Sequence, residues 1–220
     1  MCLIVFAWQK LPGLPLVVAA NRDEFHARPA SPAGFRADKP SILAGRDLEA
    51  KGTWMGVSRN GRFAAVTNYR GATEPRAQES RGALVTRFLE TSSPPGAYLA
   101  SVEQQKHQYS GFNLLVSDGE EFWSMSNRDG PPRRLEPGLY GLGNTLLEAP
   151  EVEEPKKRFS AALGAAIEPL FGVLAQSKIV NARYGTRCST VLLRQGSRIR
   201  YAERSFSPDG EDQETLHYEL

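Results

Sequence analysis

Cysteine is scarce in this 220-residue chain, which has only Cys2 and Cys188. Two cysteines cannot build a disulfide scaffold, and a reducing compartment would keep both as thiols. The sequence also lacks a CxxC motif and a histidine cluster. These absences give no sign of a metal site, and no cofactor is predicted to be required.

Long hydrophobic runs are missing as well. The first twenty residues, MCLIVFAWQKLPGLPLVVAA, are interrupted by Gln9, Lys10, Pro12 and Gly13. Each half is far shorter than the roughly 20 residues that span a bilayer. No basic region precedes the apolar run, as it would in a signal peptide. We therefore expect a cytoplasmic protein without a transmembrane segment.

An excess of one charge is also lacking. Lysine and arginine number 27 against 25 acidic residues, a net charge of +2, and the signs are interspersed. This balance does not favour a nucleic-acid partner. A chain of this length can bury one sizeable core, so a single domain over residues 1–220 is predicted.

The apolar pattern predicts strands before and after central helices. Strands are expected at Cys2–Trp8 and Leu16–Ala20, joined as a hairpin by QKLPGLP. A loop is expected over Arg28–Pro40, then a short apolar run at Ile42–Ala44 and a second hairpin turning at Asn60-Gly61.

Helices are predicted at 81–90 after an N-cap at Ser80, near 96–105, and over 154–171. Later strands are expected in FNLLVSD, EFWSMS, RRLE, STVLLRQ and RIRYAERSF. This order indicates an α+β fold in which helices pack outside two stacked, largely antiparallel sheets.

The stretch PLVVAANRDEFHARP ends an apolar run in a charged cluster, Asn21–Glu24. The predicted hairpin places this cluster beside Cys2. Arg22 would then favour the thiolate, and Asp23 could hold or position an ammonium group. Two simpler interpretations stay open: the cluster is a salt-bridged turn, or Cys2 is a buried core thiol.

Removal of Met1 would turn Cys2 into a residue with two functions. It would carry a thiol nucleophile and an α-amine whose reference pKa is about 7.7–8.0. A terminal amine of this kind can act as general base for the nucleophile.

Several ordered blocks carry a family resemblance: the initial Met-Cys, NRDE followed by RP, ILAGRDLEAKGTWMGVSRNGRFAAVTNYR, YGLGNTLLEAP and GTRCSTVLL. Together the sequence resembles the NRDE-motif family, also called the transport and Golgi organisation family. That family in turn resembles the N-terminal-nucleophile (Ntn) hydrolases of the cysteine type. The resemblance implies a four-layer αββα sandwich.

The resemblance also implies roles for six residues. They are Cys2 as nucleophile, Arg22 and Asp23 as its charged neighbours, Asn68 in the oxyanion hole, Asn144 orienting the amine, and Arg187 stabilising charge in the pocket.

Other nearby residues are interpreted as structural: Asn21 and Glu24 shape the turn, His26 is a surface or packing residue, Arg46-Asp47 is turn chemistry, and Trp54 and Cys188 belong to the core. The family's Trp-Pro-Lys triplet is replaced here by EAPEVEEPKKR, which puts any substrate contact of that triplet in doubt.

The sequence therefore predicts a cysteine-dependent amidohydrolase that cleaves a non-peptide C–N bond of a small acylated molecule. An alternative is a non-enzymatic protein that binds or traffics a hydrophobic anion, either haem as a labile ligand or a lipid of the acyl-coenzyme-A type. A third is a degenerate hydrolase fold kept as an interaction module.

Overall fold

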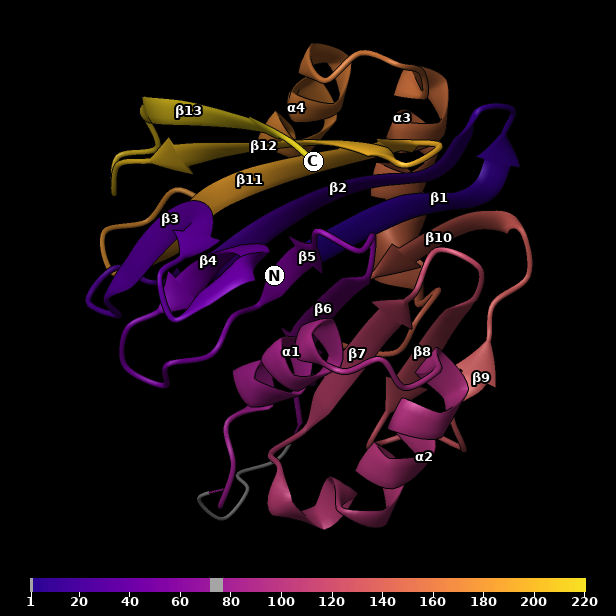
Figure 1. The fold of residues 1–220 in the computed structure, drawn as a ribbon. Helices are drawn as coiled ribbons and strands as arrows, with labels where there is room; N and C mark the ends of the chain where they lie inside the picture. Colours follow the sequence, from indigo (N-terminus) through magenta and orange to yellow (C-terminus); the bar gives the residue numbers. More distant parts are fainter. Residues whose placement is uncertain (1, 72–76) are drawn as a thin grey trace. The chain divides into compact units, whose positions relative to one another are not determined.

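The computed structural model describes residues 2–71 and 77–220 of the chain (Figure 1). Their contacts group into two compact units, each built on one antiparallel sheet. Unit 1 comprises residues 2–28, 137–143 and 147–220, and unit 2 comprises residues 29–71, 77–136 and 144–146. The α+β class with antiparallel sheets is thus confirmed, whereas the single domain over 1–220 stays a prediction.

Unit 1 contains a six-stranded sheet in the order β10-β1-β2-β11-β12-β13. Its strands are β1 (Leu3–Leu11), β2 (Leu14–Phe25), β10 (Gly138–Leu142), β11 (Tyr184–Gln195), β12 (Arg198–Phe206) and β13 (Asp212–Glu219). The predicted β1–β2 hairpin is confirmed, and β2 runs five residues further than expected, through the charged cluster. The sequence pattern missed β10 and β13.

Helices α3 (Glu153–Ala162) and α4 (Glu168–Ala175) cover one face of this sheet, after the 3₁₀ turn η2 (Pro150–Val152) (Figure 1). Val17 and Val191 from the strands pack with Phe159 and Leu170 from the helices. Each such side chain contributes about 1.5–3 kcal/mol by burial. The single helix predicted over 154–171 was wrong, because the backbone becomes extended at Leu163.

Unit 2 contains a seven-stranded sheet in the order β3-β4-β5-β6-β7-β8-β9. Its strands are β3 (Ala30–Arg36), β4 (Lys39–Asp47), β5 (Met55–Ser58), β6 (Phe63–Asn68), β7 (Phe112–Ser117), β8 (Phe122–Ser126) and β9 (Arg133–Arg134). Helices α1 (Arg81–Glu90) and α2 (Pro95–Gln104) pack on it through a shared apolar cluster, and the 3₁₀ turn η1 (Lys106–Gln108) follows.

The loop predicted over Arg28–Pro40 was wrong, since β3 and the start of β4 form a hairpin there. Pro32 is tolerated because β3 is an edge strand, and the pairing register shifts between Ser31 and Gly34. An edge or a bulge leaves a proline's missing N–H without consequence.

Two other local predictions in unit 2 are confirmed, whereas the turn predicted at Arg46 was wrong, since Arg46 lies within β4. Asn60-Gly61 turns the β5–β6 hairpin, and Gly61 has a φ of +83°, which favours glycine. Helix α1 begins after the N-cap Ser80.

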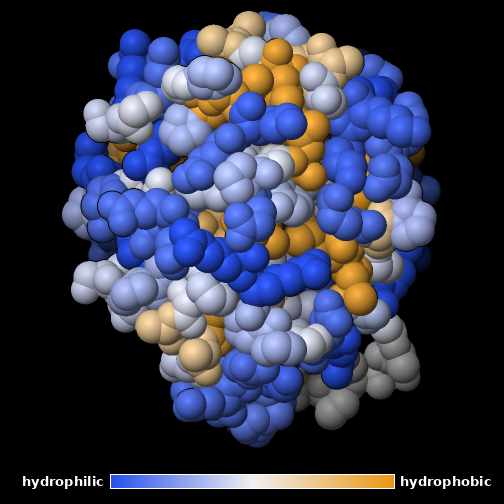
Figure 2. Space-filling view, turned by 90° about the vertical axis from the view of Figure 1, so that its right-hand side faces the viewer, coloured by the Kyte–Doolittle hydropathy of each residue, from blue (hydrophilic) through white to orange (hydrophobic). Residues whose placement is uncertain are grey.

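On the face shown in Figure 2, most of the surface is hydrophilic, and hydrophobic residues show mainly in gaps between the polar ones. Among the described residues, no helix is both long enough and apolar enough to cross a membrane.

Candidate functional site

The end of β2 lies beside the start of β1, as the hairpin predicted. Leu3 pairs with Asn21, and the Sγ of Cys2 donates a hydrogen bond to the backbone oxygen of Asp23 at 3.5 Å. Cys2 is half-buried, whereas Arg22 and Asp23 are buried. One strand end therefore collects a thiol, a guanidinium and a carboxyl group.

Burial raises the pKa of the Cys2 thiol above its usual range, and the negative charge of Asp23 raises it further. Arg22 acts in the opposite direction, as predicted, but its effect is smaller. Desolvation outweighs the guanidinium, so the pKa of the thiol stays above its usual range despite Arg22. In this arrangement Cys2 is a neutral thiol at neutral pH.

Strand β11 supplies the partner of the Asp23 side chain. Thr186 pairs with Asp23 in the β2–β11 register, and its hydroxyl donates to Asp23 Oδ1 at 2.6 Å. The same hydroxyl accepts the backbone N–H of Ile179 at 2.8 Å. Both Thr186 and Asp23 are almost fully buried. The threonine thus fixes the carboxyl group at a defined position.

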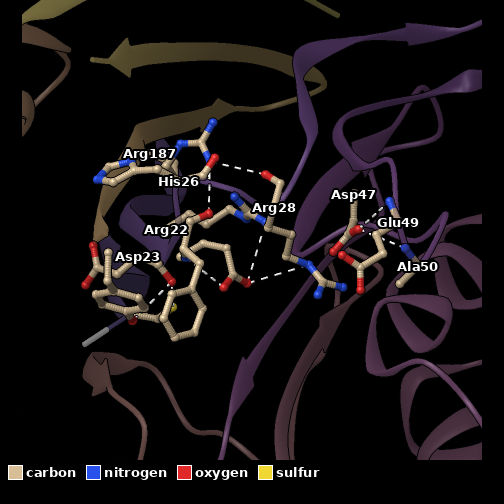
Figure 3. Close-up of polar contacts among 12 residues, drawn as sticks. Arg22, Asp23, His26, Arg28, Asp47, Glu49, Ala50 and Arg187 are labelled. Atoms are coloured by element: carbon tan, nitrogen blue, oxygen red, sulfur yellow. Dashed lines mark hydrogen bonds and ion pairs between the residues drawn. The ribbon is translucent and has the colours of Figure 1, made fainter. Parts of the chain in front are cut away.

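Arg187 occupies a register shift in β11, between the pairs made by Thr186 and Cys188. Its Nη1 lies 3.2 Å from each of three carbonyl oxygens, those of Phe25, His26 and Arg28, and donates to them (Figure 3). A bulge of this kind re-aims a side chain. Here it turns the guanidinium to hold the segment that follows β2.

Glu24 lies between two guanidiniums. Its Oε2 is 3.8 Å from Arg22 Nη2 and 3.8 Å from Arg28 Nε (Figure 3). Its Oε1 accepts the backbone N–H of Phe25 at 2.9 Å. Glu24 itself lies in β2 and pairs with Gly185, so the turn predicted at this residue was wrong, because the strand continues through the charged cluster.

Asn21 and His26 make structural contacts. The side chain of Asn21 donates to the backbone oxygen of Leu174 in α4 at 3.0 Å and accepts the hydroxyl of Ser189 at 2.6 Å. Asn21 thus links α4 to the sheet. The prediction that it shapes a turn was wrong. The Nε2 of His26 lies 2.9 Å from the backbone oxygen of Asn181.

Unit 2 contains the remaining two predicted residues, Asn68 and Asn144. Asn68 ends β6 and is exposed, whereas Asn144 is buried. Asn144 Nδ2 donates to the backbone oxygen of Asn68 at 2.8 Å, and its own backbone oxygen accepts the N–H of Arg70 at 2.6 Å. The structure brings these two asparagines together, and their catalytic roles stay predictions.

Comparison with known proteins identifies the family. The family model of Transport and Golgi organisation 2 matches residues 1–180. This chain belongs to that family.

A human Transport and Golgi organization protein 2 homolog is 33% identical over all of this chain and 96% of its own length. The mouse homolog is 39% identical over 68% of this chain and 59% of its own. The Drosophila melanogaster protein is 29% identical over 80% of this chain and 71% of its own.

Solved structures identify the fold. A variant of the conjugated bile acid hydrolase of Clostridium perfringens matches with a TM-score of 0.58 and 10% identity, over 99% of this chain and 97% of that one. Penicillin V acylase from Agrobacterium tumefaciens gives 0.55 and 12%, over 92% and 82%. The Caenorhabditis elegans ortholog of N-acylethanolamine-hydrolyzing acid amidase gives 0.56 and 12%, over 87% and 92%. The predicted Ntn-hydrolase fold is confirmed.

Within this member of the Transport and Golgi organisation 2 family, sequence reasoning missed the threonine that holds Asp23. Thr186 stands directly before Arg187 in the block GTRCST, so the signal lay next to a residue already selected. Asp47 and Cys188 agree with their predicted structural roles. Asp47 Oδ1 accepts the N–H groups of Glu49 and Ala50 (Figure 3), and Cys188 is buried.

Proposed function

We propose that the protein is a cysteine-dependent hydrolase of a small acyl amide, with Cys2 as the nucleophile. The observation that carries the proposal is the half-buried Cys2 thiol, held against the Asp23 peptide at the start of β1. Support also comes from the fold, since the three similar structures described above are named an acylase, an amidase and a hydrolase.

The chemistry divides into two steps. The sulfur of Cys2 attacks the amide carbonyl carbon, the C–N bond breaks, and the leaving amine takes up the proton that the thiol gave away. Water then attacks the resulting thioester, which releases a carboxylic acid and returns the proton to sulfur. Both steps need a base near the sulfur, because the raised pKa keeps the thiol neutral.

The base in this proposal is the α-amine of Cys2 itself, exposed when Met1 is removed. Met1 lies outside the described residues, so its removal stays a prediction. The buried carboxyl group of Asp23 would hold the resulting ammonium, and the Thr186 hydroxyl fixes that carboxyl group. The roles proposed for Asn68 and Asn144 in stabilising the charged intermediate rest on the family resemblance.

The test combines intact mass with an activity screen. The mass of the purified protein should correspond to a chain beginning at Cys2. Release of free acid should be measured from penicillin V, an N-acylethanolamine and a conjugated bile acid, the substrate classes named for the similar structures. Cys2→Ala should abolish turnover, whereas Cys188→Ala should retain it. Retained Met1, or activity that survives Cys2→Ala, would refute this mechanism.

A second candidate is the binding of a hydrophobic anion. Three guanidiniums lie at the end of β2: those of Arg22 and Arg28 pair with Glu24, and that of Arg187 donates to the backbone oxygen of Arg28 (Figure 3). They match the propionates of haem or the phosphates of acyl-coenzyme A. A histidine nitrogen can ligate haem iron, but the Nε2 of His26 already lies within hydrogen-bond distance of the Asn181 backbone oxygen. Haem therefore fits only in part.

Titration of haem and of acyl-coenzyme A separates the two candidates. The wild type should bind one of them saturably, and both Arg28→Ala and Arg187→Ala should weaken that binding. Equal binding by the wild type and both variants would count against the second candidate.

A further inference from the structure

Unit 2 contains a cavity that none of the predicted site residues lines. It has a volume of about 420 Å³ and lies at the edge formed by β3 and β4, where Phe35, Arg36, Asp38, Ala44 and Arg46 line it. Cavities of about 300–1,000 Å³ are typical of small-molecule sites. The cavity is therefore large enough for a small organic molecule rather than a bare ion.

Arg36 is one of the three charged residues that line this cavity. Its side chain is only 7% exposed, and two of its nitrogens grip Asp38: Nε lies 3.1 Å from Oδ1, and Nη2 lies 2.7 Å from Oδ2. The third nitrogen, Nη1, is buried and has no hydrogen-bond partner among residues 2–71 and 77–220. An unsatisfied buried donor on a charged group is costly, so it marks a place for an acceptor.

Arg46 repeats this arrangement from the neighbouring strand. Its Nη2 lies 3.7 Å from Asp38 Oδ2, and its Nε is buried without a partner in the described part of the chain. Two guanidiniums thus share one carboxylate, and each keeps one buried N–H for a further oxygen. A small oxyanion has two oxygens suited to two such donors.

The charges in the lining select among oxyanions. Arg36 and Arg46 are positive and Asp38 is negative, so the lining carries one net positive charge. Arg36 lowers the pKa of Asp38, which therefore stays ionised at neutral pH. A monoanionic carboxylate would balance the charge, whereas Asp38 would repel a dianionic phosphate. Phe35, Pro32 and Ala44 offer apolar surface to the rest of the ligand.

We infer that the cavity bounded by Arg36 and Arg46 is a binding site for a small organic carboxylate with an apolar body. The carboxylate pairs with the guanidinium groups of Arg36 and Arg46, and its hydrocarbon part lies along Phe35 and Ala44. The inference uses residues of unit 2 alone and does not depend on the hydrolysis proposed for Cys2.

Calorimetric titration of the full chain with hexanoate tests the site, with hexan-1-ol as the neutral probe of equal length and inorganic phosphate as the competing anion. Hexanoate should bind saturably, hexan-1-ol should not, and phosphate should bind more weakly than hexanoate. Arg46→Met should weaken hexanoate at least tenfold, because it removes a charge-assisted donor from a side chain that is one-third exposed.

Two further variants sharpen the result. Asp38→Asn should tighten hexanoate binding, because it removes the competing negative charge without removing a donor. Arg133→Met, in strand β9 at the opposite edge of the same sheet, is the matched control and should leave affinity unchanged. The inference is overturned if hexanoate does not saturate, if phosphate binds more tightly, or if Arg46→Met binds like the wild type.

Discussion

Replacement of Thr186 by valine removes one hydroxyl and keeps the shape of the side chain. In the wild type this hydroxyl donates to Asp23 Oδ1 at 2.6 Å and accepts the N–H of Ile179 at 2.8 Å. A hydrogen bond to a charged group contributes about 1.5–3 kcal/mol, and a neutral one about 0.5–1.5 kcal/mol. Since Asp23 and Thr186 are 4% and 2% exposed, water cannot easily replace the lost partner. We expect a loss of about 2–4 kcal/mol in the free energy of unfolding.

Urea-induced unfolding of the full chain measures this loss as a lower midpoint at unchanged slope. Thr186→Ser keeps the hydroxyl and should retain most of the stability. In a chain that already carries Asp23→Asn, Thr186→Val should cost less, because the carboxylate it served is gone. A loss below about 0.5 kcal/mol for Thr186→Val, within the range of an ordinary surface substitution, would refute the reasoning.

Three further predictions concern the thiols, one close backbone approach and one buried amide. Because the pKa of Cys2 is raised, its alkylation by iodoacetamide should be slow at neutral pH, and the rate should keep rising at pH values above the usual pKa of a thiol. Cys188 should react more slowly still. A Cys2 rate at pH 7 equal to that of a free thiol would contradict this. Gly52→Ala should destabilise the protein by about 1–3 kcal/mol in thermal unfolding, because its Cβ would lie 2.5 Å from the α1 backbone, whereas Gly164→Ala meets nothing within 4 Å and should be tolerated. Asn144→Ala should cost about 1–3 kcal/mol by removing the donor to the β6 carbonyl, and a variant as stable as the wild type in urea would show that this bond contributes little.

The local part of the candidate site could be predicted from the sequence. Two apolar runs separated by a turn specify a hairpin, and the hairpin register alone puts Asn21–Glu24 beside Cys2. Neither step needs information from a distant part of the chain. Many of the strands and helices could be predicted for the same reason, since each of them carries its own periodicity and end signals.

Contacts between distant segments could not be predicted in this way. Asp23 meets Thr186 across a β2–β11 pairing that joins residues 163 positions apart. The sequence of neither strand indicates this pairing register, and the bulge at Arg187 shifts the register by a further residue. The direction of the pKa shift of Cys2 could not be predicted for a related reason. It depends on how completely the thiol is desolvated, which only the packed structure reveals.

Weak local signals explain the missed elements. Strand β13 has no buried residue, so its sequence DQETLHYE lacks the apolar alternation by which strands are recognised. The Arg28–Pro40 segment was misjudged because a proline-rich edge strand resembles a loop. The division between α3 and α4 falls at Leu163, next to Gly164, which the spacing of apolar residues alone did not reveal.

The pairing of β2 with β11 determines when, during synthesis, the charged end of β2 can form its final contacts. Strands β3 to β9 are neighbours in sequence as well as in the sheet, so they can pair as they leave the ribosome. The β1–β2 hairpin is synthesised before β11. Only after β11 has been made can the Thr186 hydroxyl donate to Asp23 and the Arg187 guanidinium donate to the Phe25 carbonyl. A chain released early, before residue 184, would carry the thiol without the groups that position its neighbours. The charged end of β2 therefore matures only after residues 184–187 have been synthesised.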